Sequence, residues 1–303
     1  MARSRFIKDA GLTVRMTTVM FLLGALFVAL VVTLMYTFSN IAFLIGIGGI
    51  AVAFYQWWSS DKVAMRAMRA REVSPEEAPE LHGTIDRLCA LADMPKPRVG
   101  VSDLPVANAF ATGRSPDRAV VCVTTGILQK LDAEELEAVL AHELSHVAHR
   151  DVLVMTIASS AGIAAGLLMR FAQFGGMGRS RSNNNSGGLP VTLVVILVSL
   201  LVYAVSFVML RVLSRYRELC ADRSGAYLTM KPAALASALQ KISGESAAAI
   251  PTKDLRTANS ASALCIVPAF AGGISGLMAT HPPLEKRLEQ LARIQAELSR
   301  PSG

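Results

Sequence analysis

The chain has 303 residues, of which 52% are hydrophobic and 17% charged, and its formal net charge is +7. A positive mean hydropathy excludes an ordinary soluble protein and directs attention to membrane spans. The basic residues lie beside the apolar stretches and no RNA- or DNA-binding motif accompanies them, so we expect no nucleic-acid partner. The four cysteines are widely spaced and form no CxxC, which favours buried thiols in a reducing compartment.

Residues 1–15 form a basic N-terminus, and residues 16–60 contain no charged side chain. That run is too long for one span, because a helix rises about 1.5 Å per residue and the hydrocarbon core is about 30 Å thick. We therefore predict an uncleaved hairpin of two spans, interrupted at residues 37–40, with Trp57 and Trp58 as interfacial anchors. Both ends of the hairpin are basic, and the positive-inside rule places both in the cytoplasm.

Residues 61–151 are charged, contain prolines and are predicted to fold as a soluble segment. Helical periodicity is present in residues 75–94, and three short strands are predicted at residues 98–102, 108–113 and 119–125. Asp132 precedes Glu135 by three residues, which is the pattern of a capping box. It predicts a helix that begins there and continues through AHELSHVAHR.

Residues 152–169 and 189–210 are again uncharged, and the polar sequence GGMGRSRSNNNSGG lies between them. The simplest interpretation is a second hydrophobic hairpin over residues 152–213, which brings the expected number of spans to about four. A pair of buried hydrophobic helices is the alternative, because alanine and glycine suit close packing in lipid and in a soluble core alike. Residues 214–303 return to a mixed composition and end in a predicted helix over residues 284–298.

His142, Glu143 and His146 form the pattern H-E-x-x-H on the predicted helix. The spacing places both imidazoles on one helix face, where they can bind one Zn²⁺ at about 2.0–2.1 Å, with Glu143 beside them as a base for water. His149 is a less favoured ligand, because it lies about 10.5 Å along the helix axis from His142. Val152 stands where the eleven-residue metzincin pattern requires a histidine, which excludes that class.

Glu218 is the favoured third ligand, and Asp222 follows one turn later on the same helix face. A carboxylate in that position can accept a hydrogen bond from a ligand histidine and orient its ring. Two membrane crossings between His146 and Glu218, or none, return Glu218 to the same side, whereas a single crossing would separate the ligands. The alternative is an exposed, salt-bridged helix with no role at a metal.

Four motifs resemble the HtpX group of membrane metallopeptidases, which is related to the CAAX prenyl protease: NAFATG, VLAHELSHVAHRD, RYRELCADRSGA and THPPLEKR. The resemblance covers nearly the whole chain. With the spans above, it implies a mainly α-helical membrane protein with about four transmembrane helices. A zincin-like α/β catalytic domain with a small sheet would be divided between residues 61–151 and 214–303.

The resemblance also implies an activity and a place in the cell. It implies a zinc endopeptidase in the cell membrane, whose catalytic domain faces the cytoplasm and which clears misfolded or damaged membrane proteins. Glu143 would be the general base, and one Zn²⁺ per subunit would be held by His142, His146 and Glu218. We expect the membrane and unfolded proteins as partners and leave the oligomeric state open.

Two further segments have expected roles at the site. His281 in THPP is the candidate donor to the tetrahedral oxyanion, and the alternative is a turn that only begins the final helix. An edge strand is expected to pair with an extended substrate, and the alternative is an ordinary sheet strand. The substrate-binding residues of that strand would be Asn108, Ala109, Phe110 and Ala111.

Other functions fit the sequence less well. A prenyl-protein-processing protease would need more spans to build an intramembrane chamber. A catalytically silent zinc-binding protein would have no use for Glu143, which is not a ligand. A transporter is disfavoured, because the four apolar stretches contain no charged residue that could line an ion pathway.

Overall fold

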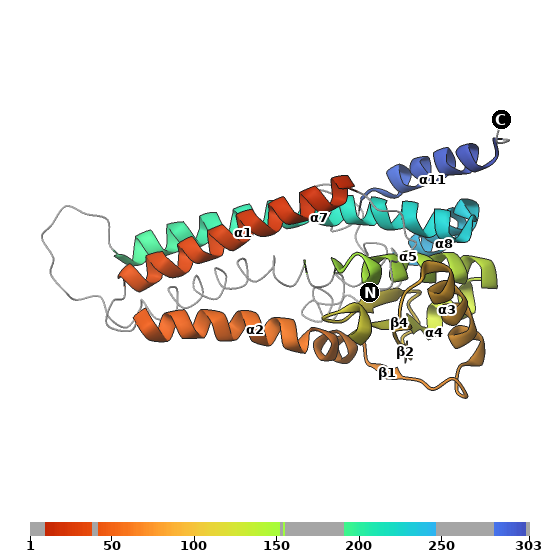
Figure 1. Ribbon diagram of the computed structural model, residues 1–303, viewed down its shortest axis with the longest axis horizontal. Coiled ribbons are helices and arrows are strands. Elements are labelled where there is room, and N and C mark those ends of the chain that lie inside the picture. The colour runs from red at the N-terminus through yellow and green to blue at the C-terminus, as the bar shows by residue number, and fades with distance from the viewer. Residues whose placement is uncertain (1–9, 38–41, 152–153, 155–190, 247–281, 301–303) are drawn as a thin grey trace, which may run out of the picture. The chain divides into compact units, whose positions relative to one another are not determined.

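The computed structural model describes residues 10–37, 42–151, 154, 191–246 and 282–300 (Figure 1). The chain divides into two compact units. The sheet unit comprises Met1–Leu12, Ser59–Leu153 and Ser214–Gly303, and the apolar unit comprises Thr13–Trp58 and Val154–Leu213. The third predicted apolar stretch and the polar sequence at residues 175–188 fall outside the described residues, apart from residue 154. The division of the chain proposed from the sequence therefore stays a prediction.

The described part of the apolar unit consists of long helices. They belong to α1 (Ala10–Thr37), α2 (Ala42–Ala67) and the first part of α7 (Val191–Thr229). Most of the predicted break, at residues 38–40, lies outside the described residues, between the end of α1 and the start of α2. Helices α1 and α7 pack through the buried side chains of Leu30, Leu34 and Val202.

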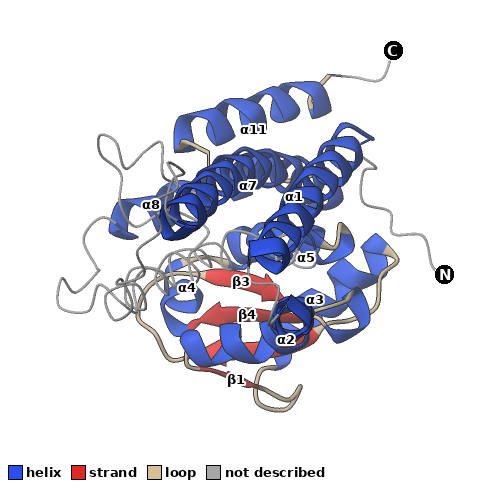
Figure 2. Ribbon diagram, turned by 90° about the vertical axis from the view of Figure 1, so that its left-hand side faces the viewer, coloured by secondary structure: helices blue, strands red, loops and turns tan. Residues whose placement is uncertain are grey.

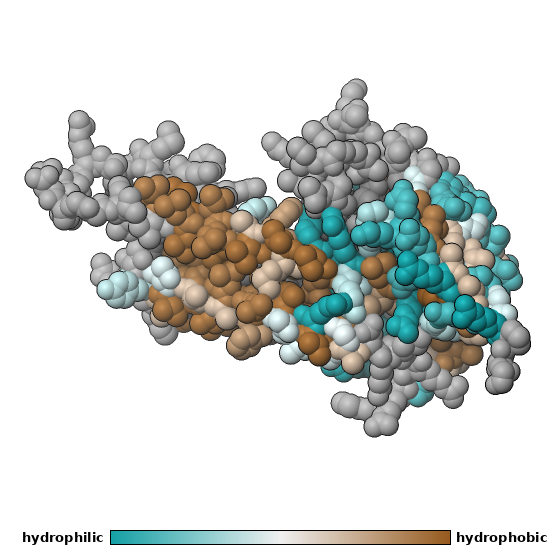
Figure 3. All heavy atoms as spheres, turned by 90° about the horizontal axis from the view of Figure 1, so that it is seen from above, coloured by the Kyte–Doolittle hydropathy of each residue, from teal (hydrophilic) through white to brown (hydrophobic). Residues whose placement is uncertain are grey.

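Outside this contact the helices of the apolar unit expose large apolar side chains, and the face seen in Figure 3 is hydrophobic over α1 and α7. A helix that is apolar all round must be buried in a larger core or in lipid. The exposed side chains include Phe21, Val28, Val32, Leu197, Leu201 and Val208.

Two helical segments are long and apolar enough to cross a membrane when the described residues are searched, Ala10–Tyr36 and Ile196–Thr229. Only 17% and 22% of their apolar windows are buried, unlike the core helix of a soluble protein. The second predicted span forms helix α2 but is not one of these two. The structure therefore shows two candidate spans of the four that the sequence predicts.

The sheet unit contains four short strands in the order β1-β2-β4-β3. Strands β2 and β4 are parallel, and the two outer pairs are antiparallel. The three predicted strands are confirmed to within two residues, and the predicted edge strand is confirmed as β3. Strand β1 was not predicted, because three residues are too few to show an alternation. The bounds are β1 Ala70–Glu72, β2 Arg98–Ser102, β3 Ala109–Thr112 and β4 Val120–Thr124.

Helices cover both faces of this sheet, and Figure 2 shows α5 lying against the strands. Val121 and Val123 of β4 point into the main core with the helices that follow the sheet in sequence. Cys122 points to the other face, where it packs with Phe110 and the end of α2. The remaining elements are α3 (Pro79–Ala92), the 3-10 helix η2 (Pro116–Arg118), α4 (Thr125–Lys130), α5 (Ala133–Ala148), α8 (Pro232–Ser246) and α11 (Leu284–Leu298).

Helix α5 begins at the predicted capping box. The Asp132 carboxylate accepts hydrogen bonds from the backbone of Glu134 and Glu135, and the Glu135 carboxylate accepts one from the backbone N–H of Asp132. Glu135 also accepts hydrogen bonds from Ser237 and Lys241 on α8. Because these bonds satisfy free N–H groups at the helix start, they fix both where α5 begins and how it is docked.

Helix α7 is continuous over 39 residues, or about 58 Å. It therefore joins the apolar stretch that ends near Leu210 to the RYRELCAD motif without an interruption. A rigid helix carries Glu218 and Asp222 into the sheet unit. The predicted closing helix over residues 284–298 is confirmed as α11, whereas α4 and α8 were not predicted.

Gly225 of α7 packs directly on the backbone of α5. A Cβ at this position would lie 2.9 Å from His142 N and 3.2 Å from His142 Cα. Alanine normally stabilises a helix by about 0.5–1 kcal/mol relative to glycine. Here the clash must push the two helices apart, so we expect Gly225→Ala to lower the free energy of unfolding by about 1–3 kcal/mol.

The matched control is Gly83→Ala on α3, where a Cβ would meet nothing within 4 Å. It is expected to raise the melting temperature, whereas Gly225→Ala is expected to lower it. Thermal unfolding of both variants in detergent measures the two changes. A gain in stability for Gly225→Ala would show that α5 and α7 are not in tight contact there.

Candidate metal centre

Three donor groups converge in the sheet unit, from His142 and His146 on α5 and from Glu218 on α7. The two Nε2 atoms are 3.3 Å apart, and Glu218 oxygens lie 3.5 Å from His142 Nε2 and 3.4 Å from His146 Nε2. Tetrahedral ligands that bind zinc at about 2.0–2.1 Å stand about 3.4 Å from one another. The three buried groups therefore have the spacing and the chemistry of a zinc site.

Both imidazoles turn their second nitrogen toward a carboxylate. His142 Nδ1 lies 2.9 Å from Asp222 Oδ1, and His146 Nδ1 lies 2.6 Å from Asp151 Oδ2. The first contact is close but poorly aligned, so charge attraction contributes more to it than a directed hydrogen bond does. A carboxylate at Nδ1 keeps the proton on that atom and leaves the Nε2 lone pair for a metal ion.

Each of these carboxylates in turn contacts a buried arginine. Arg287 on α11 donates from Nε and Nη2 to the two oxygens of Asp222, at 2.7 Å each. Arg217 on α7 places its Nε 2.9 Å from Asp151 Oδ2. Sequence reasoning identified Asp222 but missed Asp151, Arg217 and Arg287. They lie in the quoted motifs, yet nothing in the local sequence indicates which distant group each one contacts.

The buried charges around the imidazoles do not balance. The carboxylates outnumber the guanidiniums by two, so with neutral imidazoles the cluster has two excess negative charges, which a divalent cation would neutralise. The charged groups are those of Glu143, Asp151, Glu218, Asp222, Arg217 and Arg287.

The excess negative charge also acts on the imidazoles. Burial by itself would lower the pKa of His142, but the carboxylates of Asp222 and Glu218 outweigh burial and raise that pKa to about 10 without a metal. A cation is therefore favoured at this position, whether it is a proton or a metal ion. A metal ion that binds Nε2 must displace the proton.

Glu143 points from α5 toward the sheet. The backbone N–H of Ala111 on β3 faces its carboxylate and slightly favours the ionised form. Burial raises the pKa of Glu143, and the neighbouring His142 and His146 only partly oppose that rise. A raised pKa suits a carboxylate that accepts a proton and later returns it near neutral pH.

Strand β3 presents half of its backbone groups away from the sheet. The backbone N–H of Thr124 donates to Asn108 O at 2.9 Å, and Phe110 lies opposite Cys122. Since hydrogen-bonded and non-hydrogen-bonded pairs alternate in an antiparallel ladder, the N–H and C=O groups of Ala109 and Ala111 face away from β4. The strand that contacts Glu143 thus also offers an edge for pairing.

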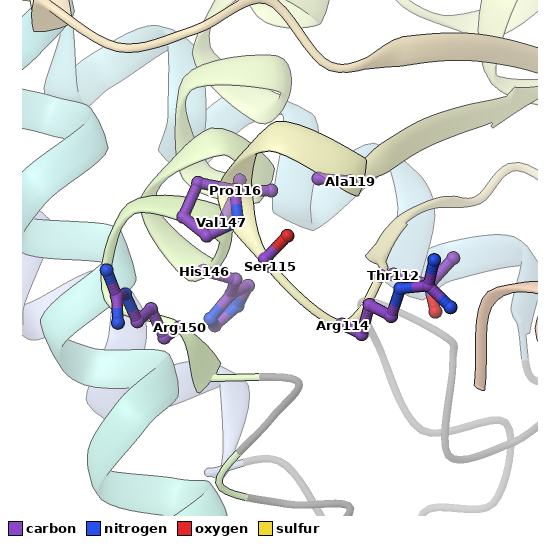
Figure 4. A pocket seen from close by; sticks show the side chains of 9 residues that line it. Thr112, Arg114, Ser115, Pro116, Ala119, His146, Val147 and Arg150 are labelled. Carbon is purple, nitrogen blue, oxygen red and sulfur yellow. The ribbon is translucent and has the colours of Figure 1, made fainter. Parts of the chain in front are cut away.

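A small hollow that is partly open to solvent borders His146. Its lining comes from the end of α5 and from the connection between β3 and β4, and it includes the apolar surfaces of Pro116 and Val147. Arg114 and Arg150 lie on opposite sides of His146 in Figure 4. The hollow follows directly on the end of β3, so an extended peptide along that strand would reach it.

The other residues singled out from the sequence lie apart from the cluster or outside the described residues. His281 is outside them, and its expected role stays a prediction. His149 ends α5, where its Nδ1 lies 2.8 Å from Ser145 O, and it is not among the converging donors. The prediction of buried thiols is confirmed for the cysteines in the described part, which are Cys89, Cys122 and Cys220.

Comparisons with known proteins agree in placing this chain among peptidases. Residues 75–295 match the model of peptidase family M48. Protease HtpX homolog 1 of Streptomyces coelicolor is 54% identical over 299 residues, covering 98% of this chain and 97% of the relative. The HtpX homolog of Moorella thermoacetica is 47% identical, covering 98% of each chain. The homolog of Pyrococcus furiosus is 42% identical, covering 86% of this chain and 91% of the relative.

A crystal structure of Ste24p from S. mikatae covers 93% of this chain and 66% of its own, with a TM-score of 0.46 and 18% identity. A structural similarity of that degree is too weak to assign a family, so the family assignment rests on the sequence comparisons. The matched family region contains the H-E-x-x-H helix and Glu218. This chain therefore belongs to peptidase family M48, alongside the HtpX protease homologues, and is a metalloprotease.

Proposed function

We propose that the chain is a zinc endopeptidase that holds one Zn²⁺ per subunit through His142, His146 and Glu218. The observation that supports this best is the convergence of three buried groups: the two Nε2 atoms are 3.3 Å apart, and each lies 3.4–3.5 Å from one oxygen of the Glu218 carboxylate. Two imidazoles and one carboxylate leave a fourth position open, as catalytic zinc sites require. When bound, zinc would polarise the scissile carbonyl and acidify a water molecule.

The chain's own residues supply the proton transfers and the orientation. Glu143 accepts a proton from the attacking water on its carboxylate and returns it to the leaving amine. The N–H of Ala111 holds that carboxylate on the side of the substrate edge. Asp222 and Asp151 keep the Nδ1 protons in place, so that both Nε2 atoms remain acceptors throughout the cycle. His281 remains the proposed additional donor to the oxyanion.

Replacing Glu143 with glutamine separates catalysis from metal binding. Glutamine cannot accept the proton, so we expect Glu143→Gln to reduce casein hydrolysis by about 10²–10⁴-fold while zinc is retained. Elemental analysis of the purified protein measures the zinc. Glu134→Gln, an exposed position on the same helix, is the control and should keep full activity. Equal activity of wild type and Glu143→Gln would support the alternative of a catalytically silent zinc protein.

We further propose that the substrate is an unfolded polypeptide that pairs with β3. The outward N–H and C=O of Ala109 and the C=O of Ala111 can form main-chain hydrogen bonds that do not depend on side-chain identity, while the Ala111 N–H faces Glu143. The backbone groups of Asn108 and Phe110 face β4, and their hydrogen bonds would hold the strand in place. Recognition of this kind suits the broad specificity needed to clear damaged or misfolded membrane proteins.

Backbone recognition can be tested on the substrate. Methylating one peptide nitrogen that faces β3 removes one hydrogen-bond donor and adds a clash. We therefore expect kcat/KM to fall about tenfold or more, because one hydrogen bond is lost and the methyl group hinders pairing. An exchange of the side chain at the same substrate position should change kcat/KM much less. A set of quenched fluorescent peptides, methylated at each position in turn, gives the comparison. A strong side-chain dependence without a methylation effect would contradict the pairing.

We also propose four membrane spans, with the sheet unit in the cytoplasm. The exposed apolar side chains of α1 and α7 support insertion, and the basic residues flanking residues 16–60 support the orientation. The polar sequence at residues 175–188 would then face the opposite side of the membrane. A prenyl-protein-processing protease remains the alternative within the enzymes, and four spans would leave it without an intramembrane chamber.

Cysteine labelling of intact cells tests this orientation. A membrane-impermeant maleimide should label Ser182→Cys in intact cells, and label Glu76→Cys in the sheet unit only after permeabilisation. The wild type with its native cysteines is the background control. Protection of both positions in intact cells would mean that residues 152–210 do not cross the membrane.

A further inference from the structure

We propose that Asp151 and Arg217 form a positioning pair for His146, and that zinc retention depends on this pair. The inference rests on the proposed zinc site. It assigns a role to two residues that are neither ligands nor proton carriers.

The geometry of the pair is that of a dedicated support. Asp151 Oδ2 accepts a hydrogen bond from His146 Nδ1 at 2.6 Å and lies 2.9 Å from Arg217 Nε. Asp151 is 1% exposed and Arg217 is 8% exposed. An exposed ion pair would contribute little, but a buried carboxylate that lost its arginine would be an uncompensated charge. The arginine therefore keeps Asp151 ionised and fixed against the imidazole.

The other histidine has the same arrangement. Asp222 faces His142 Nδ1 and is held by the buried Arg287. At each imidazole, therefore, an arginine holds a carboxylate and the carboxylate faces Nδ1 of the ring. The two sets of residues come from different parts of the sequence. The same arrangement at both rings indicates a role in orienting them.

The backbone before Asp151 is shaped to make the contact possible. Helix α5 ends at Ala148, and Arg150 has a φ of 57°, a left-handed conformation that side-chain-bearing residues rarely adopt. The Arg150 N–H donates to Val147 O at 3.1 Å, which closes the turn. The reversal brings the Asp151 side chain back to His146 instead of carrying it away along the helix axis.

The alternative is that Asp151 is only a capping carboxylate beyond the end of α5 and that Arg217 only marks the membrane edge. A capping carboxylate would affect stability without changing the metal. The positioning role instead predicts a change in metal affinity and in the coordination geometry of the bound ion. These two readouts separate the readings.

The experiment uses the full-length protein in detergent. Zinc affinity is measured by competition with a chromogenic chelator, and geometry by the visible absorption of the Co²⁺-substituted protein. We expect Asp151→Ala to weaken zinc binding by about 10–100-fold and to shift the Co²⁺ bands. Arg217→Gln should weaken binding in the same direction. Asp86→Asn, an exposed carboxylate 2.8 Å from Lys96 Nζ, is the matched control and should change neither readout.

A double variant guards against simple misfolding. The double variant Asp151→Asn/Arg217→Gln removes both buried charges. Its thermal stability should therefore exceed that of Asp151→Asn alone and of Arg217→Gln alone, while its zinc affinity stays below that of the wild type. Recovery of both thermal stability and zinc affinity to wild-type values in the double variant would overturn the positioning role. Unchanged zinc affinity and Co²⁺ bands in Asp151→Ala would overturn it as well. A wild-type protein that binds no zinc would instead refute the proposed metal site.

Discussion

Burial of unbalanced charge is the constraint on which the rest of the site depends. Four carboxylates and two guanidiniums lie around two imidazoles, and all of these groups are buried. Such a cluster is costly unless a cation completes it, because the negative charges lose their hydration without being neutralised. The same excess raises the pKa of His142, and the donors around it converge at zinc spacing. Electrostatics and geometry thus favour the same occupant.

The fold meets this constraint by bringing two helices unusually close. Helix α5 is fixed at its start by the capping box of Asp132 and by contacts of Glu135 with α8. Helix α7 reaches the backbone of α5 at Gly225, where no larger side chain has room. The ligands on the two helices can meet only because small side chains let the backbones approach. Packing of this kind tolerates little adjustment, since interiors are close-packed.

The site is also joined to the apolar part of the chain at two points. Asp151 immediately precedes the third predicted apolar stretch, and Arg217 follows the fourth on the continuous helix α7. The pair that supports His146 is therefore built from the ends of both stretches.

The sequence alone determined the features that depend on local spacing. A four-residue repeat placed His142 and His146 on one helix face, and placed Glu218 and Asp222 on another, because the α-helix has 3.6 residues per turn. Short segments separated by turn residues likewise predicted three strands. Only the tertiary structure decided which buried arginine faces each aspartate and which backbone N–H contacts Glu143. These contacts join segments far apart in the chain, and no local period specifies a partner across such a distance.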